Sequence, residues 1–300
     1  MKAYVEEFCK RRSYPKEAIR ELMKCWDEIS VVPEAMDYFR CAEARLQSGD
    51  TDVVARMELL NKVSELSGAN RMTLHLLFYI CETVFLKQRY ELAGIGVDIY
   101  EDTVEDLKCK MYECYGLHGT WGCRVRGWLD GFFTLKKFAL GRMQYEVRAC
   151  EESVSLKCGL EIKEGDLVVV MHVPVSDKPF SRAARQESYE KAYQFFKNQF
   201  PDGRIPFRVV SWLLFPENEK LLPAASNIID FMHEFDIVKR GIYPNHEELW
   251  RIFGEPYHGD AASLKRDTSV QRAYADWVAA GNETGYGVGY FIYDGKTFIK

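Results

Sequence analysis

The sequence lacks the features that would assign it to nucleic-acid-binding or membrane proteins. Its basic residues never gather into a tract interleaved with aromatics, and the 300 residues carry a net charge of −5. This charge argues against a nucleic-acid partner held by phosphate contacts. The most apolar segment, Met72–Leu86, contains His75 and Glu82 and is too short to cross a bilayer. We therefore expect neither nucleic acid nor a membrane among its partners.

A secretion signal and a disulfide pattern are also missing. Met1–Lys10 contains Glu6 and Glu7 and has no apolar core of a signal peptide. The nine cysteines are odd in number and irregular in spacing, so we expect reduced thiols. The sequence predicts a soluble, cytoplasmic protein, with a homodimer left open as its oligomeric state.

Metal-binding motifs of the forms C-x2-C and H-E-x-x-H do not occur in the sequence. Cys109, Cys114, His118 and Cys123 have a superficially zinc-like spacing. On a helix, however, Cys109 and Cys114 would point about 140° apart, at ~100° per residue. Core thiols are favoured over a structural metal, which stays an alternative, and we assign no metal ligand.

What the sequence does contain divides into two halves with different periods. Before about Gly116, apolar residues recur at intervals of three and four, as in the run that begins at Val53. Asp50–Thr51 is expected to cap that helix, and another helix is expected over Tyr100–Tyr115. The first part of the chain, residues 1–118, is predicted to be an all-helical domain.

After Gly131 the period shortens to that of strands. Phe132–Ala139 and Arg142–Arg148 predict a hairpin, and Leu167–Val173 predicts a buried strand because it is apolar on both faces. The elements expected next are a helix over Ser181–Gln199, a strand over Phe207–Phe215, a helix over Ala225–Glu234, strands over Asp236–Gly241 and Glu248–Phe253, a helix capped by Thr268 and Gln271, and a strand over Gly285–Tyr293. The fold class is α+β, with a mixed α/β sheet domain over residues 119–300.

The glycine-rich stretch GYGVGYF at Gly285–Phe291 invites comparison with a nucleotide-binding loop. It continues as a strand to the end of the chain, so the helix that would hold a phosphate is missing. Glycines at alternate positions instead predict that another backbone or an aromatic ring approaches one face of this strand closely.

Two polar side chains stand near the ends of the two central apolar strands. His172 ends LVVVMHV, and Ser211 lies near the end of FRVVSWLLF. Ligands bind beyond the carboxyl ends of such strands, where an imidazole can act as a general base and a hydroxyl can orient a substrate. The structural alternative is that both residues are merely hydrogen-bonded strand ends. A Ser–His hydrolase is disfavoured because G-x-S-x-G is absent.

The loop from Ser176 to Ser181 is a candidate anion site. It precedes a predicted helix whose amino terminus would offer free N–H groups, and Ser181 could add a hydroxyl. Arg182 and Arg185 in the first turns oppose the helix dipole, which is consistent with a negatively charged ligand there. A solvated basic face explains the two arginines equally well.

Several longer phrases resemble one family. They are FALGRMQYEV, VVVMHVPVSDKPF, SWLLFPENEKLLPAASNIIDF and KRDTSVQRAYADWVAAG, together with the HGTWG phrase at His118–Gly122. The sequence resembles the bacterial two-domain acyltransferase-like proteins, which join a helical N-acyltransferase N-terminal domain to a GNAT-like C-terminal domain. The resemblance spans nearly the whole chain.

The resemblance implies a sheet in which two central strands splay and the pantetheine arm of an acyl-coenzyme A, such as acetyl-coenzyme A, enters between them. It implies acyl transfer to an amine of a small molecule or peptide, with a strand N–H polarising the thioester carbonyl. The catalytic candidates are His172 and Ser211. The candidate cofactor contacts are Val173, Ser176, Ser181, Arg182 and Arg185.

One departure from the family pattern stands out. The usual pyrophosphate signature, Q/R-x-x-G-x-G/A, should follow the first central strand, but this chain has VPVSDKPFSRAARQ, without a glycine. The alternative function is therefore a non-catalytic ligand-binding or interaction protein on a degenerate GNAT fold.

Overall fold

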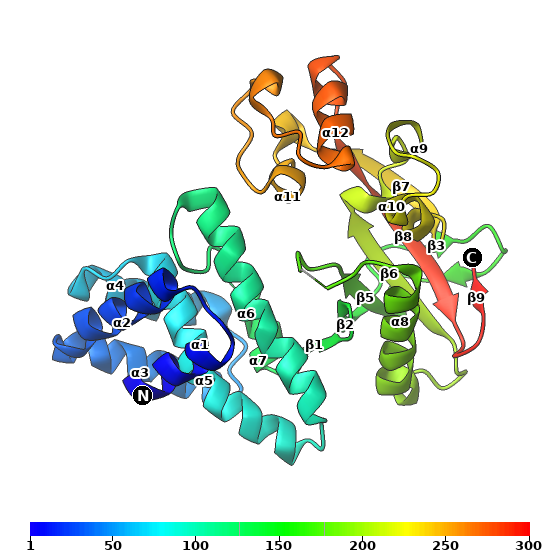
Figure 1. Cartoon of the computed structure of the whole chain (residues 1–300). Helices are drawn as coiled ribbons and strands as arrows, with labels where there is room; N and C mark the ends of the chain where they lie inside the picture. The colour runs from blue at the N-terminus through cyan, green and yellow to red at the C-terminus, as the bar shows by residue number, and fades with distance from the viewer. Residues whose placement is uncertain (126, 177) are drawn as a thin grey trace. The chain divides into compact units, whose positions relative to one another are not determined.

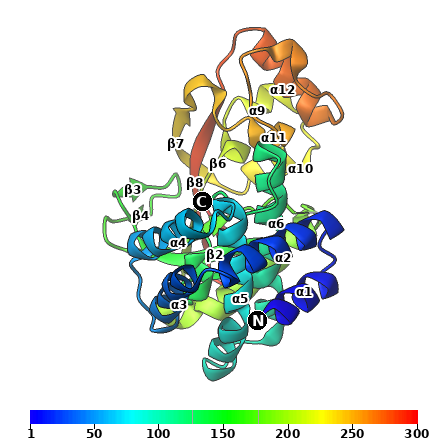
Figure 2. The same ribbon diagram turned by 90° about the vertical axis from the view of Figure 1, so that its left-hand side faces the viewer.

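A computed structural model of the whole chain describes residues 1–125, 127–176 and 178–300. The chain forms two compact units, Met1–Ala139 and Leu140–Lys300. The first is helical and the second contains a mixed sheet, which confirms the predicted α+β class (Figures 1 and 2).

Unit 1 is a helical bundle with α5 as its most enclosed member. Nearly every residue of α5 between Thr73 and Leu86 is buried, as the apolar run predicts. Asp52, and not Asp50–Thr51, accepts the capping hydrogen bond of α4. The helices are α1 (Lys2–Arg11), α2 (Lys16–Ser30), α3 (Pro33–Gln47), α4 (Val53–Ser67), α5 (Arg71–Leu92), α6 (Val97–His118) and the single turn α7 (Asp130–Phe133).

The helical unit ends later than the expected boundary at residue 118 because the segment after α6 packs into the bundle. The buried Arg56 donates a hydrogen bond of 2.6 Å to the carboxylate of Asp130. Arg89 donates to the carbonyl oxygen of Phe133 at 2.8 Å. These polar contacts join the segment to α4 and α5, and the periodicity of the sequence does not predict them.

A buried carboxyl group lies in the centre of this bundle. Glu82 of α5 is 1 % exposed, and the side-chain amide of Gln47 donates to its oxygens at 3.2 and 3.3 Å. Burial, and then the nearby carboxylate of Glu43, raise the pKa of Glu82 to about 8. Glu82 is therefore held in its neutral form at neutral pH.

Unit 2 is built on a mixed sheet in the order β2-β5-β6-β8-β7, with β9 paired to β8. Among the described strands of this order, only β5 and β6 pair in parallel, and α8 (Arg182–Phe196) connects them. The strands are β1 (Lys137–Leu140), which crosses the unit boundary, β2 (Met143–Ala149), β5 (Leu167–His172), β6 (Ile205–Ser211), β7 (Asp236–Ile242), β8 (Gly285–Tyr293) and β9 (Phe298–Ile299), with a separate hairpin of β3 (Val154–Ser155) and β4 (Glu161–Ile162).

The two faces of the sheet are covered differently. On one face α8 (Arg182–Phe196) packs through Tyr189, whose ring contacts Phe207 of β6 and Phe291 of β8. On the other face the β3–β4 hairpin packs on Val168 and Val170 of β5. Successive side chains of β5 point to opposite faces, and both sets are apolar, as its sequence predicts.

Short helices connect the remaining strands, and several replace predicted strand residues. Phe132 and Phe133 belong to α7, so the expected strand Phe132–Ala139 shortens to β1. The strand expected over Phe207–Phe215 ends at Ser211. The short helices of this unit are η1 (Lys197–Gln199), η2 (Trp212–Leu214), α9 (Asn218–Leu221), α10 (Asn227–Met232), η3 (Pro244–His246), α11 (Trp250–Phe253), η4 (Ala261–Ser263) and α12 (Ser269–Ala279).

The strand expected over Glu248–Phe253 is wrong, because those residues form the turn of α11 in a small apolar cluster. Leu249 and Phe253 pack there against Tyr274 of α12. A one-turn helix in such a cluster presents the same apolar pair as a short strand, so periodicity could not separate the two. The capping box of Thr268 and Gln271, by contrast, is confirmed.

The glycines of β8 confirm the predicted close approach. A Cβ atom on Gly287 would lie 2.2 Å from the carbonyl oxygen of Leu214, and one on Gly285 would lie 2.2 Å from that of Gly241. One on Gly289 would lie 2.5 Å from a methyl carbon of Leu214. The stripe of alternate glycines therefore lets η2 pack closely on β8 and lets the end of β7 approach β8 within the sheet.

Arg185 ties α8 to α10. Its side chain is completely buried, and its guanidinium group donates to Asp230 and, at 2.8 Å, to Glu234. The same guanidinium group lies over the ring of Phe180, in a cation–π contact. Arg182 reaches the same Asp230 from the surface, and its hydrogen bonds, followed by those of Arg185, hold the pKa of that carboxyl at about 2.

Replacing Glu82 by Gln is expected to stabilise the protein above pH 5. The folded-state pKa lies above the unfolded value of about 4.3, so the wild type loses stability as pH rises from about 4 to 8. The neutral amide avoids this loss, which is on the order of 4–5 kcal/mol at pH 8. Thermal unfolding between pH 5 and 8 measures the difference, with Glu58→Gln as an exposed control. Parallel pH curves for wild type and Glu82→Gln would contradict the burial argument.

Replacing Arg185 by Met is expected to destabilise unit 2 by about 3–5 kcal/mol, because it leaves two carboxylates without their buried partner. Arg182→Ala removes an exposed, solvent-screened ion pair and should cost much less. Urea unfolding of the two variants makes the comparison. Equal losses in both would show that Arg185 does not brace the two helices.

Candidate functional site

The pairing of β5 with β6 is short and stops before either strand ends. The paired residues are Val169 with Phe207 and Val170 with Arg208. Within the described parts of the chain, no further pair joins the two strands, although β5 continues to His172 and β6 to Ser211. The ladder therefore opens toward the carboxyl ends of the strands, the edge at which ligands bind in such sheets.

His172 stands at this opening and is held by a carboxylate. Its Nε2 lies 2.6 Å from Oε1 of Glu146 on β2, and the imidazole is 22 % exposed. Arg148 also donates to Oε1 of Glu146, at 2.7 Å, which favours the ionised carboxylate. An ionised carboxylate only accepts hydrogen bonds, so Nε2 carries the hydrogen, and whenever the ring is neutral its lone pair is on Nδ1.

The structure does not bring His172 and Ser211 together. Val170 and Arg208 are level on β5 and β6, and side chains alternate, so His172 shares a face with residue 210 while Ser211 points to the other face. Ser211 Oγ accepts the N–H of Leu213 at 3.2 Å and caps η2. A direct Ser–His pair is therefore absent between these two described residues, and the catalytic role of each stays a prediction.

The candidate anion loop follows β5 directly. Val173 is half-buried, Ser176 Oγ accepts the N–H of Lys178 at 3.1 Å, and Ser181 Oγ caps α8 by accepting the N–H of Ala184 at 3.3 Å. The member of this loop at position 177 lies outside the described residues. Ser181 thus serves the helix start, which leaves backbone N–H groups of the first turn directed at the loop.

Arg182 and Arg185 have protein partners for their charges. Both donate to Asp230, and Arg185 also donates to Glu234. The charge that opposes the dipole of α8 is thereby compensated inside unit 2, without an added ligand. Their part in cofactor binding stays a prediction.

The three cysteines and the histidine whose spacing resembles that of zinc ligands are not gathered at one place in the structure. Burial raises the pKa of Cys109 and of Cys123 to about 12 and that of Cys114 to about 11. Cys114 lies 3.6 Å from the sulfur of Met72 in the helical core. Among the described residues, no group of three or more potential metal ligands is gathered. These thiols are protonated at neutral pH and unsuited to nucleophilic catalysis.

Sequence reasoning missed the acidic partners of both sites. Glu146 meets His172 through the antiparallel register of β2 and β5, which pairs Gln144 with His172 and so puts Glu146 on the same face two residues away. Asp230 and Glu234 meet Arg185 across more than forty residues. Of these acidic residues, only Glu146 could have been suspected from the sequence, because it is an acidic residue within a strand whose first four residues are buried.

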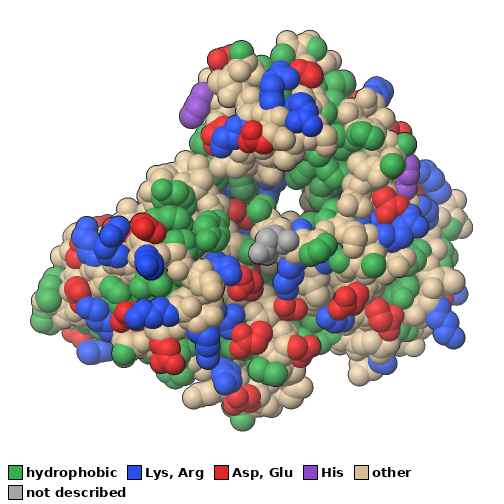
Figure 3. Space-filling view, in the orientation of Figure 1, with side chains coloured by type: hydrophobic (Ala, Val, Ile, Leu, Met, Phe, Trp, Pro, Cys, Tyr) green, Lys and Arg blue, Asp and Glu red, His purple; other side chains and the backbone are tan. Residues whose placement is uncertain are grey.

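The surface charge agrees with the composition. On the face shown in Figure 3, Lys and Arg side chains are interspersed with Asp and Glu. Among the helices in the described parts of the chain, none is long and apolar enough to cross a bilayer.

Comparison with known proteins gives two family matches and a set of similar structures. Residues 3–135 match the N-acyltransferase N-terminal domain, and residues 138–291 match the GNAT-like C-terminal domain. A search of the curated proteins finds no match.

The similar structures are acyltransferases that share 18 % sequence identity with this chain and cover 95 % of it and 86 % of their own length. They include one in complex with decanoyl-CoA (TM-score 0.75), a tryptophan-to-alanine variant with octanoyl-CoA (TM-score 0.71), and one with decanoyl-CoA and teicoplanin (TM-score 0.69). At this identity they show a common fold. The two family matches, with the helical unit and the mixed sheet described above, show that the chain belongs to the two-domain acyltransferase-like family with an N-acyltransferase N-terminal domain and a GNAT-like C-terminal domain.

Proposed function

We propose that this protein transfers an acyl group from acyl-coenzyme A to an amine of a small molecule or peptide. The observation that carries the proposal is the His172–Glu146 pair beside the opening of the β5–β6 ladder. A base and a backbone N–H donor for the thioester carbonyl are two parts that favour direct amine attack on a thioester. The acyl-coenzyme A complexes of the similar structures support the choice of donor.

The residues present fit such a donor in two respects. Past Val170, no ladder pair joins the described residues of β5 and β6, so backbone groups on that side of β5 can bond to the amides of a pantetheine arm. The helix start after Ser181 offers N–H groups to a pyrophosphate. Because Arg182 and Arg185 are paired with acidic residues, backbone donors would carry most of the phosphate binding.

The chemistry then divides between the donor and the protein. When bound, acyl-coenzyme A supplies a thioester whose carbonyl carbon forms the new C–N bond while the C–S bond breaks. Nδ1 of His172 takes the proton that the amine loses, and Glu146 stabilises the imidazolium that results. The N–H of Val173 is the proposed donor to the carbonyl oxygen. Ser211 points to the other face of the sheet, so the role proposed for it is to position the end of β6 beside the acceptor and not to take part in the proton transfer.

We expect acyl-coenzyme A to bind the wild-type protein. Calorimetric titration with acetyl-, octanoyl- and decanoyl-coenzyme A gives the affinity and its dependence on chain length, and free coenzyme A serves as the reference. Saturable binding of one or more of the thioesters is the expected result. No heat of binding for all three would favour a non-catalytic protein on a degenerate GNAT fold.

Replacing His172 by Ala is expected to lower kcat by about 10²–10⁴-fold while the Kd for acyl-coenzyme A stays within about twofold. Glu146→Gln, which keeps an acceptor oxygen but removes the charge, should lower kcat by about tenfold. Release of the coenzyme A thiol in the presence of spermidine, an aminosugar or a lysine-containing peptide measures turnover. His233→Ala, an exposed histidine of the same unit, is the matched control. Unchanged turnover in His172→Ala would remove His172 as the base.

A further inference from the structure

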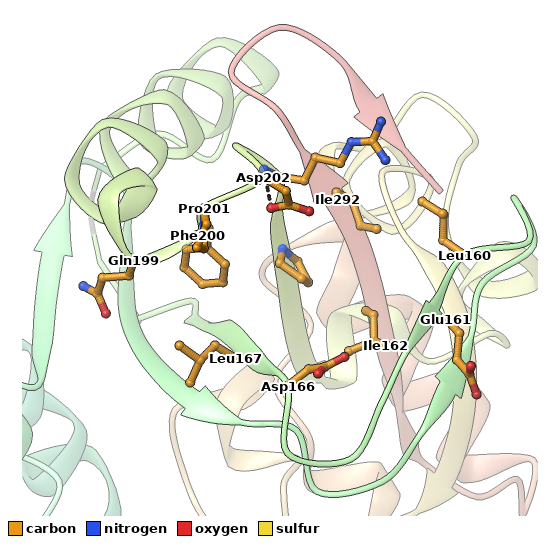
Figure 4. Close-up of a pocket in the computed structure, with 12 residues that line it drawn as sticks. Leu160, Glu161, Ile162, Asp166, Leu167, Gln199, Phe200, Pro201, Asp202 and Ile292 are labelled. Atoms are coloured by element: carbon orange, nitrogen blue, oxygen red, sulfur yellow. Dashed lines mark hydrogen bonds between the residues drawn. The ribbon is translucent and has the colours of Figure 1, made fainter.

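A cavity of about 420 Å³ lies in unit 2 at the edge of the sheet where β5 and β6 begin (Figure 4). The β3–β4 hairpin, the start of β5, the segment that leads into β6 and the end of β8 form its walls. Leu167, which lines it, precedes His172 by five strand residues, a separation of about 16 Å at 3.3 Å per residue. The cavity is therefore distinct from the opening of the β5–β6 ladder.

The floor of the cavity is apolar. Ile162, Phe200 and Ile292 line it and are 3, 6 and 6 % exposed, so their positions are fixed by the core. Leu167, by contrast, is 46 % exposed at the mouth. Leu167 therefore supplies most of the apolar surface that a ligand in this cavity could remove from water.

The rim of the cavity is predominantly acidic. Figure 4 shows the carboxyl groups of Asp166 and Asp202 at opposite ends of the cavity, while Gln199 points away from it. One oxygen of each aspartate accepts a nearby backbone N–H, at 2.8 Å for Asp166 and 3.1 Å for Asp202, which fixes both groups. Glu161 adds a third carboxyl and Arg204 a single guanidinium group. The acidic side chains thus outnumber the basic one by three to one.

We propose that this cavity binds a small amphiphilic amine, with its alkyl or aryl body against Leu167 above the isoleucine and phenylalanine floor and its ammonium group toward the acidic rim that Asp166 and Asp202 form. A carboxylate ligand would meet three like charges, and a neutral ligand would gain nothing from the rim. The volume lies at the lower end of the range of small-molecule sites, which favours a small ligand over a protein partner.

Binding of 4-phenylbutylamine to the full-length protein tests this assignment. Methyl-labelled NMR locates the ligand, because the signals of Ile162, Leu167 and Ile292 should shift together; Ile292→Val assigns one of them. We expect a Kd on the order of 1 mM for a ligand of this size. The uncharged 4-phenylbutanol and the anionic 4-phenylbutyrate should bind about fivefold or more weakly.

The double variant Asp166→Asn/Asp202→Asn should weaken amine binding about five- to tenfold, because two partly hydrated ion pairs are lost while the asparagine oxygens still accept the backbone bonds. Asp37→Asn/Asp276→Asn changes the net charge equally at exposed helix positions and should leave the affinity unchanged. Equal affinities for amine and alcohol, shifts at other methyl groups, or no shift at about 10 mM amine would each overturn the proposal. A lysyl-phenylalanine amide that binds at least tenfold more tightly would assign the cavity to a basic peptide instead. Acyl-coenzyme A titration of the double variant, expected to match wild type, keeps this test separate from acyl transfer.

Discussion

The parallel pairing of β5 with β6 is the constraint on which the rest of unit 2 depends. Parallel neighbours cannot be joined by a tight turn, so the chain must cross over the sheet, and α8 makes that crossover. The crossover brings both carboxyl ends to one edge. His172, the loop before α8 and Ser211 all stand at that edge for this reason, although they are far apart in the sequence.

The crossover helix must in turn be held against its neighbours, and a buried charge does this. Arg185 lies inside the protein with Asp230 and Glu234, and Tyr189 donates to Glu234 at 2.6 Å from the next turn of α8. Breaking such a group leaves uncompensated charge in a low dielectric, so the contact fixes geometry more strictly than apolar packing would. The position of the helix start, and hence of any anion it binds, depends on that geometry.

Much of the fold followed from periodicity and turn chemistry. The apolar run of β5, the capping box of α12 and the alternate glycines of β8 act over a few residues, so the sequence shows them directly. The end of β6 at Ser211 was missed, since WLL is equally suited to a strand and to a turn of helix.

The site was predicted only in part, because its contacts cross between distant elements. His172 could be picked out as a polar strand end, but Glu146 joins it only through the register of β2. The sequence shows that Arg182 and Arg185 lie at a predicted helix start, where cations are unusual. It does not show that acidic residues of the protein compensate their charge. Register and tertiary ion pairing carry no local signal.

The glycine stripe of β8 also limits how this sheet can vary. With the carbonyl oxygens of Leu214 and Gly241 where a methyl group would have to fit, even alanine at Gly285 or Gly287 would push η2 or β7 away from β8. That face of β8 is closed to substitution for steric reasons alone. If substitutions at these positions abolish function in a mutational survey, we expect loss of folding to be the cause. We expect variants with altered activity to carry their changes in the loops at the strand ends.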